Sequence, residues 1–313
     1  MSEETLLPRI SVVTPSLNKG RYLRQCIESV LSQDYPNLEF FIVDGGSTDE
    51  SLSIIQEYGS AISYSVSEPD CGQSDAINKG FRRASGEIVA WLNADDYYFD
   101  GVFERVIDVY KDDPTAPFYF GDGLRVDEDG TVISNFSPTG TMIFDRQALI
   151  MGLNYILQPS AFINRRSLEQ VGYLDVGLRY GMDSDLWIRL SSVGIPRVVP
   201  SVLAATREYA TTKTALGSFE RVEELRQISM KHSGLPMTPG VLCYLLDVIY
   251  RTTKQHEKVF PSSYLTDVVL FWEKTQKLLE NFNAGPDGFP LNPKEKYPRF
   301  GKLHKTMMSK KRQ

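Results

Sequence analysis

Two adjacent carboxylates, Asp95 and Asp96, end the segment Gly86–Asp96, just after a run of apolar residues. A short apolar run bounded by Gly and polar residues predicts a strand that is buried on both faces of a parallel sheet. Ligands of such sheets bind beyond the carboxyl ends of the strands. Because side chains alternate along an extended chain, we expect Asn93 and Asp95 to share a face and Asp96 to point away. A carboxylate here suits a hard divalent cation that also holds phosphate oxygens, and a helix cap before residues 101–110 is the alternative.

A second pair of carboxylates, Asp183 and Asp185, begins a predicted helix whose apolar face carries Leu186, Leu190 and Val193. An Asp at this position serves either as a cap of the helix or as a general base. The helix follows the sheet that carries the first pair, and this placement favours the role of a base.

Polar clusters follow three of the predicted strands, 9–14, 38–43 and the strand before Asp95. The carboxyl ends of neighbouring parallel strands lie side by side, so the clusters should converge on one crevice. No G-x-G-x-x-G follows the first strand and no G-x-x-x-x-G-K-[ST] occurs in the sequence, which argues against dinucleotide and P-loop sites. The clusters are Thr14, Ser16 and Asn18, then Asp44, Ser47 and Asp49, then Asn93, Asp95 and Asp96.

The first hundred residues alternate between strand and helix patterns three times, which predicts right-handed βαβ units. The expected helices are 22–33, a helix begun by the capping-box spacing of Ser47 and Glu50, and 74–84. The fold class is therefore α/β, with a mostly parallel sheet flanked by helices. Residues 118–120 and the turn at 127–130 suggest a hairpin, and 160–164 a further strand.

The last third of the chain is predicted to be helical. A polar loop at Thr206–Thr214 is interpreted as a lid over a bound diphosphate or as an ordinary linker. Helices are expected at 219–232, 241–250 and 264–282. The expected division is a catalytic domain at 1–216, a helical region at 217–293 and a basic tail at 294–313.

Of the 313 residues, 42% are hydrophobic and 24% charged, as in ordinary globular proteins. The N-terminus has no apolar h-region, and no apolar run approaches the ~20 residues that span a bilayer. The three cysteines form no metal or redox motif, and three histidines argue against a His-based metal centre. These features predict a cytoplasmic protein.

The net charge of −6 is unevenly distributed. The segment from Lys294 onward carries eight Lys and Arg residues against the single acid Glu295, so the rest of the chain is strongly acidic. An acidic body argues against a nucleic-acid partner. The basic tail either docks peripherally on anionic lipid at the inner face of the cell membrane or serves as a solvated tail.

Six segments resemble family-2 glycosyltransferases with the GT-A fold, of the inverting type that builds bacterial cell-surface polysaccharides. The resemblance covers about residues 8–215 in the right order, and the helices beyond Ser218 carry none of it. The segments are TPSLN (14–18), VDGGSTDES (43–51), EPDCGQSDAINKG (68–80), SGEIVAWLNADD (85–96), QPSAFINRRSLEQVGYLD (158–175) and GMDSDLWIRL (181–190).

The resemblance implies where a nucleotide-sugar donor and a metal would bind. Asn93-Ala94-Asp95 stands at the place of the family's Asp-x-Asp motif, with Asn for the first Asp. Mn²⁺ or Mg²⁺ is then expected on Asp95, with Asp96 as a second ligand. The base and ribose of the donor are expected on Thr14, Pro15, Ser16 and Asp44. The full set of expected donor contacts is Thr14, Pro15, Ser16, Asn18, Asp44, Gly45, Ser47, Asp75, Asn78, Lys79, Asn93, Ala94 and Asp95.

The resemblance also places the catalytic base at Asp183, although Met182 stands where many members have Glu. A His that is frequent in the family's late loop is replaced by Tyr209, so its contact with metal or diphosphate is not carried over. The implied reaction moves a sugar from a nucleoside-diphosphate donor, expected to be a UDP-sugar, to a hydroxyl of a cell-surface or lipid-linked glycan.

Two other functions are weighed against this one. A sugar-phosphate nucleotidyltransferase should carry a Gly-rich, basic loop after the first strand, and TPSLNKGRY matches that poorly. A catalytically inactive nucleotide-sugar-binding module should have lost the chemistry, whereas both Asp95 and Asp183 are present.

Overall fold

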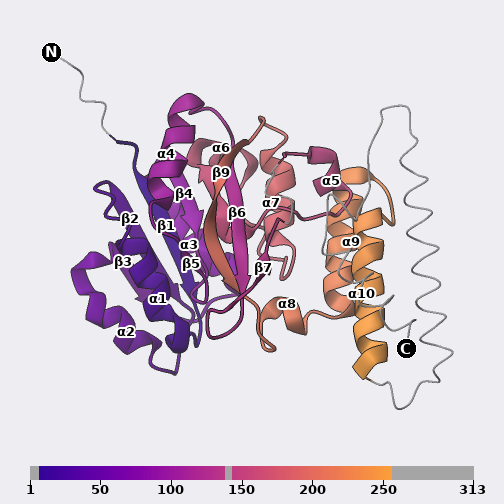
Figure 1. The fold of residues 1–313 in the computed structure, drawn as a ribbon, viewed down its shortest axis with the longest axis horizontal. Coiled ribbons are helices and arrows are strands. Elements are labelled where there is room, and N and C mark those ends of the chain that lie inside the picture. The colour runs from indigo at the N-terminus through magenta and orange to yellow at the C-terminus, as the bar shows by residue number, and fades with distance from the viewer. Residues whose placement is uncertain (1–6, 138–142, 256–313) are drawn as a thin grey trace. The chain divides into compact units, whose positions relative to one another are not determined.

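The computed structural model describes residues 7–137 and 143–255, which form two compact units (Figure 1). The described residues of the first unit fall within Met1–Phe136, Thr141–Arg146 and Ile156–Leu216. Those of the second unit fall within Ser137–Gly140, Gln147–Tyr155 and Gly217–Gln313. In the described part of the chain, no helix has both the length and the apolar character needed to cross a membrane.

The first unit is built on one sheet with the strand order β3-β2-β1-β4-β8-β6-β9-β5, and β7 pairs with β6 at its side. The strands are β1 (Ile10–Ser16), β2 (Leu38–Asp44), β3 (Tyr64–Ser67), β4 (Ile88–Trp91), β5 (Tyr97–Tyr98), β6 (Phe118–Val126), β7 (Val132–Asn135), β8 (Ala161–Asn164) and β9 (Arg197–Arg207). Its helices are α1 (Gly20–Leu31), α2 (Ser51–Tyr58), α3 (Gln73–Arg83), α4 (Val102–Asp112), α6 (Arg165–Val171), α7 (Met182–Leu190) and α8 (Lys213–Leu216), with 3₁₀ turns η1 (Gly59–Ala61) and η2 (Gln158–Ser160).

The first half of the sheet confirms the α/β prediction. Strands β3, β2, β1 and β4 are parallel neighbours, with Ser16 in register with Asp44 and Val13 with Trp91. All four residues of β4 are buried, as expected for a strand covered on both faces. The carboxyl ends of β2, β1 and β4 therefore lie next to one another.

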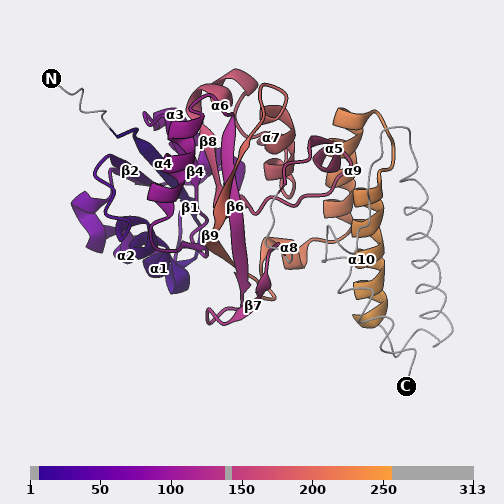
Figure 2. The same cartoon turned by 45° about the horizontal axis from the view of Figure 1, so that its top comes forward.

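The second half of the sheet is mixed. The predicted hairpin is present as β6 and β7, and β8 pairs antiparallel with both β4 and β6. Strand β9 was not predicted, because Pro200 interrupts its apolar pattern and Pro is disfavoured inside sheets. It nevertheless runs parallel to β6 through register shifts between Phe120 and Gly123 (Figures 1 and 2). The predicted loop Thr206–Thr214 consequently begins within β9 and ends in α8.

The start of α1 is capped by side chains that follow β2, in the loop before α2 and in the first residue of α2. The backbone amides of Asn18, Lys19 and Gly20 donate to Ser47 Oγ (2.7 Å), Ser51 Oγ (3.2 Å) and Asp49 Oδ2 (2.9 Å), in that order. The predicted capping box is wrong, because α2 begins at Ser51 without a side-chain cap from Ser47. Ser47 instead holds the neighbouring loop, so the two loops at the carboxyl ends of β1 and β2 are fixed to each other.

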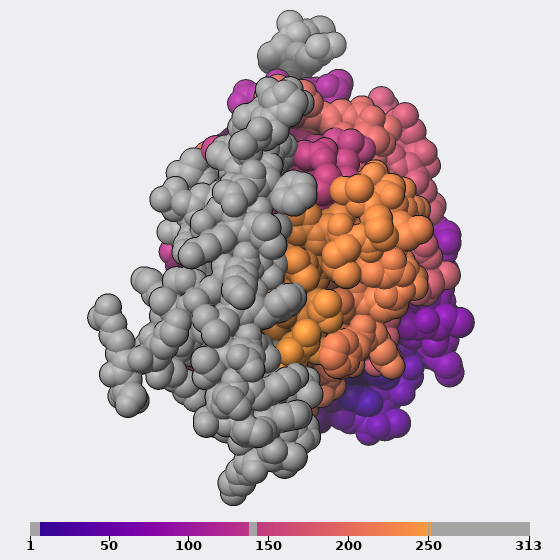
Figure 3. Space-filling view, turned by 90° about the vertical axis from the view of Figure 1, so that its right-hand side faces the viewer, coloured from indigo at the N-terminus to yellow at the C-terminus, as the bar shows by residue number. Residues whose placement is uncertain are grey.

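The second unit contains α9 (Phe219–Ser233) and α10 (Pro239–Gln255). It also contains the short helix α5 (Arg146–Ile150) except for its first residue, Arg146, which belongs to the first unit. Helices α9 and α10 pack through Val222, Leu225, Val241 and Val248 and are orange in Figure 3. These helices confirm the predicted C-terminal helical region over 219–232 and 241–250. The predicted helix at 264–282 and the basic tail lie outside the described residues, and the division at 216, 293 and 313 stays a prediction.

Asp49 offers a test of the shared cap, because its Oδ1 also accepts from Ser51 N at 3.0 Å. We expect Asp49→Ala to lower the free energy of unfolding by about 1–2 kcal/mol, and Asp49→Asn to lower it by less, since the amide oxygen still accepts. Burial raises the pKa of Asp49, but hydrogen bonds from Ser51 and Gly20 outweigh this and lower it. The stabilisation is therefore full above the ordinary aspartate pKa of about 4 and is lost as the pH falls below it.

Urea denaturation at several pH values measures this effect. The matched control is Asp108→Ala, which removes an exposed carboxylate of α4. Equal losses in the two Ala variants would contradict a capping role for Asp49.

Candidate functional site

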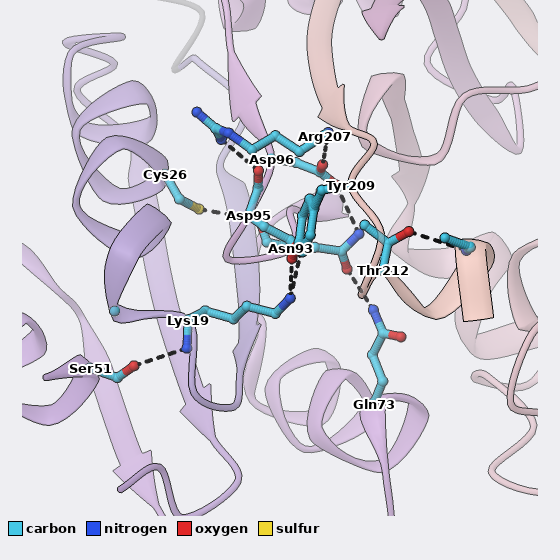
Figure 4. Close-up of polar contacts among 12 residues, drawn as sticks. Lys19, Cys26, Ser51, Gln73, Asn93, Asp95, Asp96, Arg207, Tyr209 and Thr212 are labelled. Carbon is cyan, nitrogen blue, oxygen red and sulfur yellow. Dashed lines mark hydrogen bonds and ion pairs between the residues drawn. The ribbon is translucent and has the colours of Figure 1, made fainter. Parts of the chain in front are cut away.

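The polar clusters after β1, β2 and β4 come together in the first unit. Figure 4 shows the third cluster, Asn93, Asp95 and Asp96, together with Lys19, which follows the first cluster in the sequence. Asn18 links the first two clusters, since its side-chain Oδ1 accepts from Thr48 N at 2.8 Å and its backbone N–H donates to Ser47 Oγ. Lys19 links the first cluster to the third through Asp95. The convergence expected from the sequence is therefore present.

Asp95 is surrounded by positive and hydroxyl groups. Its Oδ2 accepts from Lys19 Nζ (2.8 Å) and from the hydroxyl of Tyr209 (2.6 Å), and its backbone oxygen accepts from Arg207 Nη1 (2.6 Å). Burial lowers the pKa of Lys19, but the charge and hydrogen bond of Asp95 outweigh it and raise that pKa above its ordinary value. Lys19 is therefore a cation that faces a carboxylate in the crevice.

Asp96 points into the protein and is only 3% exposed. It accepts from Asn93 Nδ2 (2.9 Å) and from Arg207 N (3.1 Å). Burial, followed by the charge of Asp95, raises the pKa of Asp96 above the ordinary aspartate value. The expected alternation of side chains is wrong here, because β4 ends at Trp91 and the chain turns, with Asp96 N bonded to Asn93 O. Asn93 consequently faces Asp96.

Asn93 uses both ends of its amide. Its Oδ1 accepts from Gln73 Nε2 (2.7 Å), and its Nδ2 donates to Gln158 Oε1 (3.0 Å) as well as to Asp96. A carboxylate at this position could not donate and would add a further negative charge close to Asp95. The two donor contacts of Nδ2 therefore give Asn93 a structural role that an aspartate at this position could not fill.

Lys213 Nζ, in α8, donates to Oε1 of the same Gln73 at 2.9 Å. Tyr209 and Lys213 thereby fix both ends of the loop after β9 to the crevice, the first through Asp95 and the second through Gln73. A polar loop held in this way can cover a bound ligand and exclude water.

Asp44 organises the loop after β2. Its carboxylate accepts from Gly46 N, from the amide and hydroxyl of Ser47, and from Ser67 Oγ, at distances between 2.5 and 3.1 Å. Gly46 has φ +88°, a left-handed conformation that favours glycine. Gly45 lies against Asp70, where a Cβ would come within 2.6 Å of a carboxylate oxygen.

The three predicted contacts at the end of β1 are buried. Thr14 Oγ1 lies 3.7 Å from Cys26 Sγ, and Pro15 follows Thr14 in β1. The hydroxyl of Ser16 is buried without a hydrogen-bond partner in the described part of the chain. A polar ligand group in the crevice would satisfy it.

Helix α3 connects the crevice to the segment before α7. Asn78 is buried, and its amide both donates to Leu174 O (2.8 Å) and accepts from Leu174 N (3.0 Å). Lys79 instead pairs with Glu68 (2.9 Å) and Asp75 (3.6 Å) nearer the surface. The structure thus gives Asn78 a positioning role.

Helix α7 carries the second pair of carboxylates at its start, as predicted. Asp185 is fully buried and binds Arg189, whereas Asp183 is half-buried and accepts from Ser184 N at 2.7 Å. Trp187 of this helix stacks on Trp91 of β4, with centroids 5.6 Å apart. This stack fixes the helix that bears Asp183 to the strand that leads to Asp95.

Five polar residues that surround Asn93 and Asp95 were not predicted as site residues: Lys19, Gln73, Gln158, Arg207 and Lys213. Their positions in the sequence, more than their residue types, could have indicated that they belong to the site. Lys19 directly follows the first cluster, Gln73 and Gln158 lie inside segments that carry the family resemblance, and the other two lie in the predicted polar loop. Tyr209 was noted only as a departure from the family, yet its hydroxyl contacts Asp95.

Among residues 7–137 and 143–255, no three His, Cys, Asp or Glu side chains form a group that could hold a metal ion. A Mg²⁺-type ion usually takes only one or two carboxylates together with substrate phosphates and water. The carboxylate of Asp95, whose side chain is 17% exposed, fits the role of one such ligand.

Comparison with known proteins gives consistent matches. The model of the family described as glycosyl transferase family 2 matches residues 11–172, just over half of the chain. An uncharacterised glycosyltransferase of Rickettsia typhi is 29% identical over 235 residues, which cover 72% of each chain. Chondroitin synthase of Escherichia coli is 26% identical over 191 residues, which cover 60% of this chain and 27% of that protein.

Two solved structures share the fold. TarS of S. aureus in complex with UDP-GlcNAc has a TM-score of 0.58 at 18% identity, covering 86% of this chain and 83% of that one. The mannosyltransferase PcManGT of Pyrobaculum calidifontis, in complex with GDP-Man and Mn²⁺, has a TM-score of 0.54 at 20% identity, covering 77% and 70%. These likenesses confirm the GT-A fold expected from the sequence.

Asn78 can be tested as a positioning residue. We expect Asn78→Ala to lower the free energy of unfolding by about 2–3 kcal/mol, because the buried N–H and C=O of Leu174 lose their partners. The matched control is Lys79→Ala, which removes only a surface ion pair and should change stability little. Urea denaturation of both variants decides, and similar small losses would contradict the positioning role.

Proposed function

The chain belongs to glycosyl transferase family 2, and we propose that it transfers a sugar from a nucleoside-diphosphate donor to a hydroxyl of a glycan, with inversion at the anomeric carbon. The observation that carries the proposal is the convergence of polar side chains at the carboxyl ends of β1, β2 and β4, where Asp95 lies beside Lys19. In a doubly wound sheet this is where a nucleotide is expected to bind.

The donor is proposed to be a UDP-sugar. The unpartnered hydroxyl of Ser16 and the neighbouring Thr14 and Pro15 would contact its nucleoside, next to the loop that Asp44 organises. TarS carries UDP-GlcNAc in a related fold, which supports a uridine donor, whereas PcManGT carries GDP-Man. The other residues of the expected set remain proposed contacts on the strength of the family motifs alone: Asn18, Gly45, Ser47, Asp75, Asn78, Lys79, Asn93 and Ala94.

A divalent ion, Mn²⁺ or Mg²⁺, is proposed to bind on Asp95 together with the donor diphosphate. When bound, it would neutralise the charge that develops on the leaving nucleoside diphosphate. Asp96 is the weaker candidate as a ligand, since both of its oxygens already accept hydrogen bonds inside the protein. The Mn²⁺ in the PcManGT complex supports metal use in this fold.

Asp183 is proposed as the general base. The acceptor hydroxyl must lose a proton as its oxygen attacks the anomeric carbon, and a half-buried carboxylate can take that proton. Attack from the face opposite the leaving group inverts the configuration, by the geometric logic of single-displacement glycosidases. The Trp91–Trp187 stack keeps the carboxylate in place relative to β4.

The acceptor is proposed to be a cell-surface or lipid-linked glycan. The chondroitin synthase relative supports polysaccharide synthesis as the setting. Cytoplasmic location and peripheral membrane contact through residues 294–313 remain proposals that rest on the sequence.

The donor class can be tested with a thermal-shift panel of UDP, GDP, dTDP and CMP, each with Mn²⁺ or with EDTA. A ligand that binds only the folded state raises the melting temperature by mass action. We expect UDP with Mn²⁺ to give the largest shift, and EDTA to reduce it. A larger shift from GDP would reassign the donor, and no shift from any nucleotide would favour an inactive module.

Asp183→Asn tests the base. Asn caps and packs in a helix start much as Asp does, so folding and the UDP-dependent thermal shift should persist. Transfer, followed as nucleotide release with an acceptor glycan, should fall by about 10²–10⁴-fold. Full activity in the folded variant would end the assignment, and Asp145→Asn serves as a control for the loss of a carboxylate elsewhere.

A further inference from the structure

Lys19 lies directly on the carboxylate proposed to bind the metal (Figure 4). Its Nζ is 2.8 Å from Asp95 Oδ2, and Tyr209 donates to the same oxygen. Nζ also donates to the Tyr209 hydroxyl and lies 5.1 Å from the centre of its ring. The side chains of Lys19 and Asp95 are 30% and 17% exposed, so water screens their interaction only in part.

The contacts that start α1 come from the backbone of Lys19 and not from its side chain. Its amide donates to Ser51 Oγ, and its carbonyl accepts from the amides of Tyr22 and Leu23 at 2.9 Å each, which starts α1. The aliphatic stem and ammonium are therefore available for a role in the crevice.

The neighbouring cation Arg207 is held differently. Its guanidinium donates to Asp95 O and to Gln25, and it lies over the rings of Tyr22 and Tyr97 at about 5 Å. Arg207 is 6% exposed and fixed on several sides. Lys19 carries its charge on a flexible four-carbon stem with three donors, which suits a group that changes partners.

We propose that Lys19 is an exchangeable counter-ion: it occupies Asp95 while the donor is absent and moves to the diphosphate oxygens when Asp95 takes the divalent ion. This inference rests on the proposed function, in particular on Asp95 as the metal ligand. It assigns Lys19 as a donor-binding residue that couples the binding of the ion to that of the nucleotide.

Electrostatics gives the exchange its direction. A divalent ion arriving alone at Asp95 would stand beside an ammonium group in a partly buried site, and the two cations would repel each other. An ion that arrives with a diphosphate brings phosphate oxygens that the ammonium can bind. Ion and nucleotide should therefore each raise the affinity for the other, and a coupling of this kind is reciprocal.

The test is Lys19→Met, which keeps the stem and removes the charge. Binding of Mn²⁺ is followed by electron paramagnetic resonance, without nucleotide and with saturating UDP. We expect the variant to bind Mn²⁺ alone about tenfold more tightly than the unmodified protein, and to bind UDP in the presence of Mn²⁺ about tenfold more weakly. Lys111→Met, which removes an exposed ammonium of α4, should change neither affinity.

A purely structural Lys19 would not produce a gain in affinity for Mn²⁺. Unchanged or weaker binding of Mn²⁺ alone by Lys19→Met, up to millimolar ion, would overturn the exchange. Melting temperatures of the variants in EDTA check that they are folded.

Asp95→Asn separates this failure from a failure of the proposed metal site. If Asp95→Asn loses Mn²⁺-dependent UDP binding while Lys19→Met behaves like the unmodified protein, only the exchange is wrong. If Asp95→Asn keeps Mn²⁺-dependent UDP binding intact, Asp95 is not the metal ligand, and the metal site and the exchange both fall.

Discussion

Two adjacent carboxylates at the end of a buried strand have to be balanced by charges and donors from elsewhere in the chain, and this requirement organises the crevice. Asp95 accepts hydrogen bonds from Lys19, in the loop after β1, and from Tyr209, in the loop after β9. Asp96 accepts hydrogen bonds from the side chain of Asn93 and from the backbone amide of Arg207. Segments nearly two hundred residues apart in the sequence thus meet at one pair of residues.

The same residues serve both the fold and the proposed chemistry. The side chains of Ser47, Asp49 and Ser51 satisfy the amides at the start of α1, which places Lys19 over the crevice. The Trp91–Trp187 stack ties the helix of Asp183 to β4. A site built from strand ends that are fixed to each other can orient a donor and an acceptor without large rearrangement.

The sequence allowed the parallel half of the sheet and the convergence of its polar ends to be predicted, because continuous apolar runs and βαβ alternation are local signals. Strand β9 was missed, since its pairing with β6 tolerates Pro200 only through register shifts that no local pattern reveals. The contacts of Lys19 and Tyr209 depend on tertiary distances. The expected alternation of side chains after β4 was wrong, because the chain turns between Asn93 and Asp96. The hydrogen bonds between Asn78 and Leu174 join residues 96 positions apart, so no local pattern predicts them.

The central claim is that a nucleoside diphosphate binds at the carboxyl ends of β1, β2 and β4. Hydrogen–deuterium exchange of the full chain, with and without UDP and Mn²⁺, tests it residue by residue. The account predicts slower exchange of amides in residues 16–20, 45–51, 93–97 and 206–213, with helices α9 and α10 unchanged. Protection confined to other segments, or UDP binding that leaves these four unaffected, would contradict it.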